Sequence, residues 1–463
     1  MMRRRNFLTG VFAAAVTPNF ARAKACIEKK AEFKEAANVD ICVLGGSCTG
    51  VFAAVRAARL GAKVAIVEQA NGFGGVAVNG LVNVWHSFMD TEFKRQIIGG
   101  MSQEVVERLK TRGAVTTLEK NESIVFLLNP FELKTELDEL VLEAKVIPFL
   151  HSLFSEPYTE DGKIVGAIID GKSGRRIIRA KYFIDATGDA DFCLRGGFKV
   201  YTPDSVQPAT MCALVKNFDS KLIIKHSKEF NIPPTFIWDA LLPGGDLRLL
   251  AGTRISGRFM ADSEDLTFAE IEGRRQTRAI MDIMRKYGKN DAKSHLLGLP
   301  SYIGIRETRH IASLHRITED EALNGVRYPD AIANGSYRFD VHHQDRSGVT
   351  FHYLDGTAKY ISGNAPVKEF MWRKKTLPEN PTFYQMPLRS LIPQNSCNVI
   401  AAGRMIDAAP LAFSGIRVMV NMNQLGEAAG VATYLALKSG KNIGDVSAEE
   451  VRKTLASGGS III

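Results

Sequence analysis

Cysteine is scarce in this chain and is poorly placed for metal chemistry. The 463 residues include 6 cysteines, and no two stand in the Cys-x-x-Cys spacing of many zinc and iron–sulfur sites. The sequence therefore predicts neither a metal site nor a cluster. Cys42 lies in an apolar run and is interpreted as a small buried side chain. Cys48 lies in a glycine turn, where it could be reactive, although its position favours packing.

Only a small surplus of positive charge remains once the first residues are set aside. The formal net charge is +9, but residues 1–25 hold five basic residues and no acid, so the rest of the chain carries 9 − 5 = +4. No basic stripe is interleaved with aromatic residues, and nucleic acid is not expected as a partner. The hydrophobic fraction of 45% is that of a globular protein with a large core.

Apolar runs long enough to cross a bilayer are also lacking in the sequence. The apolar stretch 7–16 is too short to span a membrane. It follows three arginines at 3–5 and precedes Pro18, and small residues at 21–25 offer a cleavage site. This order is typical of a signal peptide. The segment 1–25 is therefore predicted to direct export, leaving no transmembrane span after its removal.

The start of this segment resembles a specific export signal. Arg4-Arg5-Asn6-Phe7-Leu8 matches the twin-arginine pattern Arg-Arg-x-Phe-Leu. That route carries folded proteins, which suits a protein that takes up a cofactor before export, and it predicts a periplasmic location. A frayed native N-terminus and a lipid anchor on Cys26 are the alternatives.

The best-defined motif is the stretch 39–68, which reads as strand, tight turn, helix and strand. An apolar run at 39–44 is followed by the turn Gly45-x-Ser47-x-x-Gly50, and Glu68 ends the second strand. In this pattern the N-terminus of the helix receives a pyrophosphate, and the acidic residue binds a ribose hydroxyl. Ser47 replaces the usual glycine, so an ordinary strand–helix–strand unit without a nucleotide remains the alternative.

Glycines recur after this motif. Gly74 and Gly75 belong to a loop that can lie against a flat ring or a phosphate. His86 follows shortly and is interpreted as a structural histidine rather than a catalytic one. Helices are predicted over 101–111 and 129–145.

The rest of the chain divides into segments by how its predicted strands and helices alternate. A β-meander is predicted over 146–180, followed by a strand and a Gly-Asp turn at 182–189. The α/β rhythm is lost from 201 to 383, with a helix-like run at 267–287 and strand-like alternation at 302–315. A strand with a glycine turn returns at 397–404, and Gly415-Ile416-Arg417 is predicted to open a helix that rejoins the first sheet.

The predicted fold class is α/β, with a Rossmann-like sheet and an inserted α+β domain. The predicted parts are a signal peptide at 1–25, a nucleotide-binding domain at 38–200 and 384–445, a substrate domain at 201–383 and a C-terminal tail at 446–463.

Four separated motifs together resemble one family. They are GGSCTG with Glu68, FGGVAVNG, IDATGDAD, and NVIAAGRM followed by SGIRVM. This set resembles the FAD-dependent oxidoreductases of the glutathione-reductase-like class, and most closely the family that shares the flavin module of heterodisulfide reductase. The resemblance covers most of residues 39–440. It includes the segments 304–311, 336–342 and 384–393 inside the expected substrate domain.

The resemblance implies FAD as cofactor. The residues it assigns are Gly45, Gly46, Ser47 and Gly50 for the pyrophosphate, Glu68 for the adenosine ribose, Gly74 and Gly75 for the glycine loop, Val146 for the adenine, Gly188 and Asp189 for the ribityl and pyrophosphate region, Gly403 and Arg404 for the flavin side, and Gly415, Ile416 and Arg417 for the pyrimidine edge of the flavin. Larger relatives carry iron–sulfur clusters, but this sequence lacks their cysteines. It also lacks a second complete nucleotide motif, so NAD(P) is not expected as a fixed second cofactor.

Candidate catalytic residues come from the inserted region and the strand after it. His342 is the predicted proton carrier, with Asp340 to orient it. Arg306 and Arg389 are predicted to orient a small acid or other oxygen-rich substrate, because arginine binds carboxylates in a bidentate fashion. Tyr384 is a candidate proton donor. Structural roles, such as an internal ion pair between Arg306 and Glu307, remain the alternative for each.

Two functions follow from these residues. The first is an exported FAD-dependent oxidoreductase acting on a small organic substrate, carboxylate- or hydroxyl-bearing, by hydride transfer at flavin N5. The second is a flavin-bearing electron-transfer subunit of a larger redox complex. A partner protein or a quinone would then exchange electrons with the flavin. A nucleotide-binding module without redox activity ranks last.

Overall fold

The computed structural model describes residues 33–463, apart from 121–122, 234–236, 289–293, 364 and 375–376. The predicted signal peptide and Cys26 lie outside the described residues. Residues 34–463 pack as one unit. The division of this unit at 201 and 383 into cofactor and substrate domains stays a prediction.

A five-stranded parallel sheet forms the base of the fold. Its order is β24-β11-β2-β3-β7, and every neighbouring pair runs parallel. The strands are β2 (Ile41–Leu44), β3 (Val64–Val67), β7 (Ile147–Phe149), β11 (Tyr182–Asp185) and β24 (Val399–Ala401). β2, β3, β11 and β24 are buried along their whole length, as their apolar runs predict. The predicted α/β, Rossmann-like fold is confirmed, and the late strand β24 does rejoin the first sheet.

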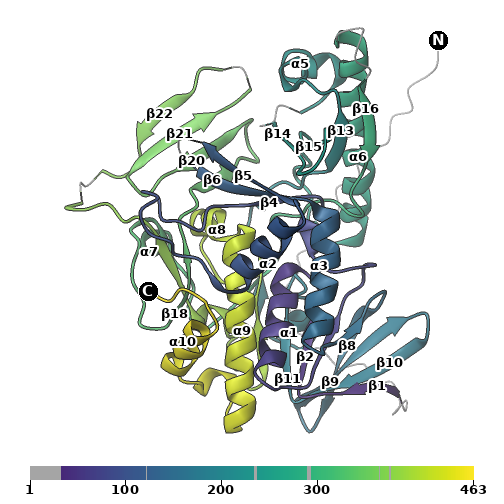
Figure 1. The fold of residues 1–463 in the computed structure, drawn as a ribbon, viewed down its shortest axis with the longest axis vertical. Helices are drawn as coiled ribbons and strands as arrows, with labels where there is room; N and C mark the ends of the chain where they lie inside the picture. Colours follow the sequence, from purple (N-terminus) through teal and green to yellow (C-terminus); the bar gives the residue numbers. More distant parts are fainter. Residues whose placement is uncertain (1–32, 121–122, 234–236, 289–293, 364, 375–376) are drawn as a thin grey trace, which may run out of the picture. The chain divides into compact units, whose positions relative to one another are not determined.

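Two helices distant in sequence pack in close contact over this sheet. α1 (Cys48–Arg59) and α9 (Met419–Ser439) run side by side in the centre of Figure 1. A Cβ atom added at Gly426 would lie 2.1 Å from the Thr49 carbonyl oxygen, and one at Gly430 would lie 2.3 Å from that of Ala53. The two glycines of α9 therefore allow contact between the two helix backbones.

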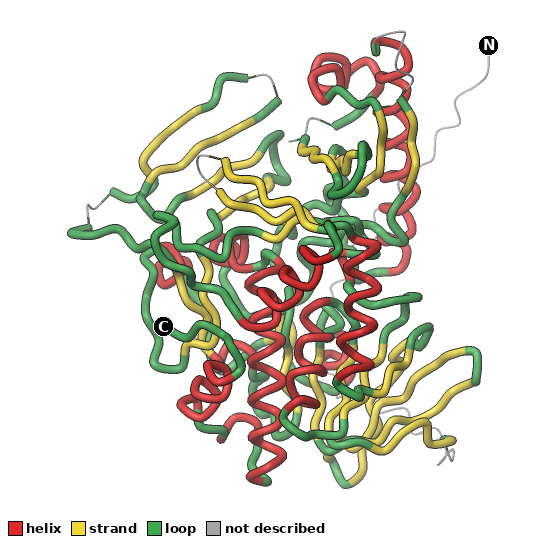
Figure 2. Tube along the Cα trace, viewed as in Figure 1, coloured by secondary structure: helices red, strands yellow, loops and turns green. Residues whose placement is uncertain are grey.

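The helices predicted near 101–111 and 129–145 are present beside α1. They are α2 (Gly100–Thr111) and α3 (Pro130–Glu143). Asn129 caps α3 as its sequence predicts, because its side-chain oxygen accepts a 3.0 Å hydrogen bond from the Phe131 N–H. Figure 2 shows these helices together with α1 and α9 in the middle of the molecule, with strands on both sides.

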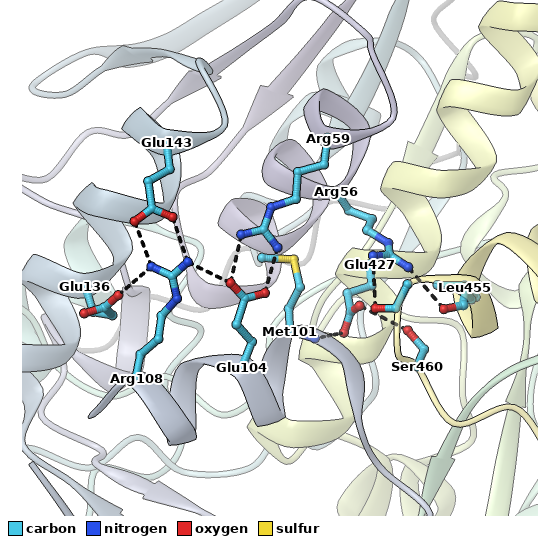
Figure 3. A network of polar contacts seen from close by, with 11 residues as sticks. Arg56, Arg59, Met101, Glu104, Arg108, Glu136, Glu143, Glu427, Leu455 and Ser460 are labelled. Atoms are coloured by element: carbon cyan, nitrogen blue, oxygen red, sulfur yellow. Dashed lines mark hydrogen bonds and ion pairs between the residues drawn. The ribbon is translucent and has the colours of Figure 1, made fainter. Parts of the chain in front are cut away.

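A buried carboxylate links α9 to α2 and to the end of the chain (Figure 3). Glu427 accepts hydrogen bonds from the Met101 N–H, at 3.0 Å, and from the Ser460 hydroxyl, at 3.1 Å. Close by, Arg56 of α1 donates to the Leu455 carbonyl oxygen at 3.1 Å. The C-terminal segment predicted as a tail is thus hydrogen-bonded to the central helices, and part of it forms α10 (Ala448–Ser457).

The predicted β-meander is present, with one strand more than expected. Its order is β1-β10-β9-β8. The strands are β1 (Lys34–Asn38), β8 (Leu153–Glu160), β9 (Lys163–Gly171) and β10 (Gly174–Arg179). Asp161 and Gly162 turn β8 into β9 with φ of 49° and 76°, the left-handed conformation that two-residue hairpins favour. β1, which was not predicted, pairs with β10 in parallel.

Two antiparallel sheets lie within the inserted region. The first has the order β14-β15-β13-β16, and the second has the order β19-β20-β21-β22. Their strands are β13 (Cys212–Lys216), β14 (Trp238–Leu241), β15 (Arg248–Ala251), β16 (His295–Gly298), β19 (Phe339–His342), β20 (Val349–His352), β21 (Thr357–Ile361) and β22 (Lys368–Met371). The predicted helix is α6 (Ser263–Tyr287), and its buried face packs on the first of these sheets.

Shorter elements connect these units. The strands are β4 (Val84–Trp85), β5 (Val115–Lys120), β6 (Ser123–Leu128), β12 (Val200–Tyr201), β17 (His310–Ile311), β18 (Ala331–Gly335) and β23 (Tyr384–Pro387). The helices are α4 (Asp191–Arg195), α5 (Ser220–His226), α7 (Glu319–Leu323) and α8 (Pro410–Ile416), with single turns at Gly75–Ala77, Ser227–Phe230, Leu388–Leu391 and Ile443–Asp445. The alternation predicted at 302–315 yields only the two residues of β17 as a named strand.

Candidate active site

A cavity of about 420 Å³ lies where the parallel strands end. Ligands of open α/β sheets bind outside the carboxyl ends of the strands, and this cavity reaches the residues that follow β2, β11 and β24. The predicted site residues that line it are Gly45, Ser47, Glu68, Gly74, Gly75, Gly188, Asp189, Arg306, His342, Gly403, Arg404 and Arg417. The predicted residues that do not line it are Gly46, Gly50, Val146, Tyr384, Arg389, Gly415 and Ile416.

The turn after β2 is built for close approach of a ligand. Gly45 has φ of +104°, and a Cβ there would lie 2.2 Å from the Ala186 carbonyl oxygen. A Cβ at Gly50 would lie 1.9 Å from the carbonyl oxygen of Gly45. Ser47 caps α1, since its hydroxyl accepts a 3.4 Å hydrogen bond from the Gly50 N–H. Gly50 thus supports the turn from behind, while Gly45 and Ser47 face the cavity.

Glu68 is fixed at the end of β3. Its two carboxylate oxygens accept hydrogen bonds from the Gly46 N–H, at 2.7 Å, and from the Ala70 N–H, at 2.8 Å. Burial raises the pKa of this carboxyl above its ordinary value, and the two N–H groups oppose that rise. Glu68 lines the cavity, and each oxygen keeps a further lone pair that can accept a hydrogen bond from a ribose hydroxyl. Gly46, outside the lining, serves to hold Glu68.

A second anchored carboxylate follows β11. Asp189 accepts a 2.5 Å hydrogen bond from Arg404 and another of 2.5 Å from the Thr308 hydroxyl. Gly188 has φ of +87°, and a Cβ there would lie 2.5 Å from Nη1 of Arg404. The glycine therefore lets the Arg404 side chain cross the turn beside Asp189. The predicted pairs at 188–189 and 403–404 come together at one wall.

The adenine contact predicted at Val146 does not reach the cavity. Val146 is buried and precedes β7, where its N–H closes the end of α3 on Val141. The cavity is lined instead by Ser152–Phe154, which follow β7. The chain passes the cavity only after the carboxyl end of this strand, so the predicted position falls one strand length too early.

The helix expected to open at Gly415 begins later. Gly415 and Ile416 end α8, and α9 begins at Met419 with Val418 as its N-cap. Val418 and Met419 line the cavity, whereas the Gly415 carbonyl oxygen accepts a hydrogen bond from the Tyr384 hydroxyl at 2.8 Å. A helix N-terminus does face the cavity, as predicted, but it belongs to α9.

Five polar side chains meet at the far end of the cavity. Asp340 lies at their centre, with Oδ1 2.5 Å from Nη2 of Arg417. Its Oδ2 accepts a 3.0 Å hydrogen bond from the Tyr337 hydroxyl and lies 3.5 Å from Nε2 of His342. Arg306 is the fifth. Burial alone would raise the pKa of Asp340, but the charge of Arg417 and the contact with His342 hold that pKa well below its usual range.

His342 is neutral in this setting. Burial, and then the charge of Arg306, lower its pKa to about 4, although Asp340 opposes the shift. The prediction that this ring titrates near neutral pH is therefore corrected. At neutral pH the ring is therefore in the form that can accept a proton, and Asp340 lies beside it to stabilise the charge that results.

Arg306 provides positive charge next to His342. It donates to the Pro208 carbonyl oxygen at 2.6 Å and to the Thr210 hydroxyl at 2.7 Å. Burial lowers its pKa to about 10, which leaves it charged at neutral pH. No salt bridge to Arg306 is present among the described residues. Glu307 lies instead 3.3 Å from His310, so the alternative of an Arg306–Glu307 pair is not what the structure shows.

Two predicted catalytic residues have structural surroundings. Tyr384 is fully buried, and its hydroxyl is held by the Gly415 carbonyl oxygen and by the Asn421 amide. Arg389 pairs with Asp330 at 2.7 Å and keeps 36% of its side chain exposed. Neither lines the cavity. Sequence proximity to the cofactor motifs does not reveal which way a side chain points.

Other residues that line the cavity were not predicted as catalytic. His86 packs against Tyr337 with ring centroids 4.0 Å apart and ring planes tilted by 33°, and both line the cavity. Burial, and then the charge of Arg338, lower the pKa of His86 to about 3. Burial raises the pKa of the Cys48 thiol to about 12, which supports packing over reactivity. In the sequence, the segment SYRFDVH at 336–342, which contains Tyr337 and Asp340, is the feature that could have indicated that these side chains line the site.

Within the described part of the chain, no three His, Cys, Asp or Glu side chains gather as a set that could hold a metal ion. Among the described residues, no helix has both the length and the apolar character needed to cross a membrane.

A parallel sheet with a glycine turn, an anchored acidic residue and a large cavity at its strand ends defines a dinucleotide-binding α/β protein. The chain belongs to the FAD-dependent oxidoreductase family, whose model, described as "FAD dependent oxidoreductase", matches residues 40–455. It is therefore an oxidoreductase with FAD as cofactor. The glycine turn, which added Cβ atoms would fill, and the anchored Glu68 fit this cofactor.

The chain is similar to two flavoenzyme structures of low sequence identity. A geranylgeranyl bacteriochlorophyll reductase-like protein from Thermoplasma acidophilum is 15% identical, covering 91% of this chain and 83% of its own, with a TM-score of 0.47. The p-nitrophenol 4-monooxygenase of Pseudomonas putida DLL-E4 is 12% identical, covering 90% and 84%, with a TM-score of 0.46. No curated protein matches the sequence significantly.

Proposed function

We propose that this protein oxidises or reduces a small organic substrate, carboxylate- or hydroxyl-bearing, by hydride transfer. The observation that carries the proposal is the single cavity that runs from the glycine turn to Arg306, Asp340 and His342. FAD, when bound, supplies the two-electron redox chemistry. A cofactor site that shares its cavity with a buried base and a charged arginine suits a substrate enzyme better than a protein that only relays electrons.

The roles of the side chains follow from their surroundings. In the oxidation of an alcohol, bound FAD would supply the hydride acceptor, and the hydroxyl proton released as the carbonyl forms would need a base in the protein. Neutral His342 accepts that proton, and Asp340 stabilises the imidazolium. Arg306 binds a substrate oxygen, because its charge is buried and no carboxylate of the described chain pairs with it.

A substrate screen with paired variants tests this function. Purified protein is mixed anaerobically with small alcohols and acids, and bleaching of the visible flavin spectrum is followed. With an identified substrate, His342→Ala is expected to keep FAD and to lower turnover by about 10²–10⁴-fold. Arg389→Ala, which alters an ion pair outside the cavity, is expected to stay within about twofold of the native rate.

Native turnover by His342→Ala would contradict the assigned role of this residue. A flavin that no small molecule bleaches, but that a partner protein or a quinone reduces, would instead favour the electron-transfer function. Within the family, the motifs that resemble the flavin module of heterodisulfide reductase are compatible with that second function.

The proposal includes export to the periplasm through the twin-arginine route. It rests on Arg4, Arg5 and the short apolar stretch after them. Replacing both arginines with lysine is expected to retain the protein in the cytoplasm, as measured by cell fractionation. Unchanged periplasmic delivery would contradict the twin-arginine route.

A further inference from the structure

A second cavity, of about 390 Å³, adjoins the first. It lies between the segment 86–93, which follows β4, and residues 353–359 at the turn between β20 and β21. His86 and Tyr337 line both cavities. This tilted pair of rings, 4.0 Å between centroids, is therefore a shared wall between the two spaces.

This wall is connected to the candidate catalytic group. The Tyr337 hydroxyl donates to Asp340, the same carboxylate that lies 3.5 Å from His342. Because the pKa of His86 is lowered to about 3, its ring is neutral at physiological pH. A ligand that passes this wall would therefore meet neutral aromatic surfaces, and its end would arrive beside Arg306 and His342.

The lining of the second cavity indicates a neutral ligand rich in hydroxyl groups. Five short hydroxyl side chains line it, and such groups can donate and accept hydrogen bonds. They are Ser87, Thr91, Ser336, Thr357 and Thr382. Ser336 and Thr357 already donate to the Met89 carbonyl oxygen and to Asp355, so these two offer a ligand their acceptor lone pairs. The aromatic rings of Phe93 and Tyr353 add apolar surface. Carboxylates and cations both occur in the lining, and Lys359 pairs with Glu369 at 3.5 Å, so no cluster of cations selects an anion.

One carboxylate of the lining is available to such a ligand. Asp90 is buried, and its Oδ1 accepts hydrogen bonds from the N–H groups of Lys94, at 3.0 Å, and Arg95, at 3.3 Å. These bonds fix the side chain at the cavity. Its Oδ2 has no hydrogen-bond partner among the described residues. A ligand hydroxyl would satisfy this oxygen, and a ligand anion would be repelled by it.

We propose that the second cavity binds the non-reacting part of an elongated, uncharged carbohydrate substrate. The reacting end of that substrate lies across the His86–Tyr337 wall, beside Arg306 and His342. The inference rests on the proposed function, since it specifies the substrate class of the same site. Sugar rings carry apolar C–H faces for the aromatic side chains and hydroxyl groups for Asp90 and the surrounding serines and threonines.

Binding of maltose and glucose to the FAD-loaded protein tests the proposal. Isothermal titration calorimetry of the native protein is expected to show maltose binding at least about tenfold more tightly than glucose, because maltose has a second sugar ring to place in the second cavity. Thr382→Trp, which fills the second cavity, is expected to remove this difference and leave glucose binding unchanged. Glu379→Trp, an exposed position in the same segment, is the matched control and keeps the native preference.

Asp90→Asn provides a second test that keeps the cavity volume. Its amide oxygen still accepts from the backbone of the turn, so the fold is maintained, and a loss of maltose affinity of about tenfold is expected. Native maltose binding by both Thr382→Trp and Asp90→Asn would overturn the proposal. So would a yellow protein that is bleached by a small acid and binds neither sugar, a result that leaves the proposed oxidoreductase function standing.

Discussion

Nη2 of Arg417 lies 2.5 Å from Oδ1 of Asp340, and the two side chains are only 13% and 10% exposed. The pair joins the loop before α9 to the strand β19, so the start of a helix that lines the cavity is tied to the strand that carries the candidate base, His342. Asp340→Asn is expected to lower the free energy of unfolding by about 3–5 kcal/mol, because Arg417 is left buried without its counter-charge. Urea denaturation at neutral pH measures this, and a loss below about 1 kcal/mol would contradict it.

Activity should depend on pH only in the acid range. With a pKa of about 4, His342 is neutral from alkaline pH down to about pH 5. A reaction that needs the neutral ring therefore keeps a constant kcat/KM over that range and loses it below, with a midpoint near 4. Initial rates with an identified substrate measure the profile. A midpoint between 6 and 7 that His342→Ala removes would contradict the neutral buried ring.

The same histidine should make stability depend on pH. Its pKa falls from an ordinary 6.5 to about 4 on folding, so the unfolded chain takes up the proton first as the pH drops. Stability is then fully present above 6.5 and is lost between 6.5 and 4, by up to about 3 kcal/mol. Urea denaturation of the native protein and of His342→Phe at both ends of this range measures the difference.

Glu427 should show the opposite dependence. Burial raises its pKa from an ordinary 4.5 to about 7, so the folded protein holds this proton longer than the unfolded chain. Stability from this group is present below 4.5 and is lost as the pH rises to 7, by roughly 3 kcal/mol. Glu427→Gln keeps an acceptor for the Met101 N–H and removes the titration. Thermal denaturation at pH 5 and pH 8 is expected to show a smaller change for the variant.

FAD retention should depend on Gly50. A side chain there would lie 1.9 Å from the Gly45 carbonyl oxygen, so Gly50→Val must displace the turn that is predicted to receive the pyrophosphate. The variant is expected to purify with less than about a tenth of the native flavin absorbance. Gly245→Val is the matched control, because the nearest atom to its added Cβ lies 3.8 Å away. Full flavin in the Gly50 variant would place the pyrophosphate elsewhere.

The sequence predicted the elements of the five-stranded sheet and its helices well, because apolar runs and capping residues within each element determine them. Apolar runs formed β2, β3 and β11, and Asn129 capped α3 as its position suggests. The start of α9 was placed too early because Gly415 packs against Phe339, with 2.5 Å between its added Cβ and that ring, rather than opening a helix. A tertiary contact of this kind leaves no periodic signal in the sequence.

The candidate catalytic group was predicted only in part for a related reason. Arg306 and His342 were chosen by residue type, and the fold brings them into one cavity with Asp340. Tyr384 and Arg389 have equally suitable chemistry, but their hydrogen bonds to Gly415 and Asp330 direct them away. Side-chain direction depends on partners 30 to 60 positions distant (31 for Tyr384, 59 for Arg389), which one sequence does not identify.

The close contact of α9 with α1 also sets the order in which the site can be completed during synthesis. Gly426 meets the backbone of Thr49, and β24 pairs with β11, so the last quarter of the chain finishes a sheet that begins near residue 41. At roughly 5–20 residues per second, a ribosome makes α9 on the order of 20–80 s after α1. During that interval β11 has an unpaired edge and the glycine turn lacks one wall. A growing chain released before residue 399 would therefore lack β24 and the cavity-lining residues that follow it, at 403–404 and 417–423.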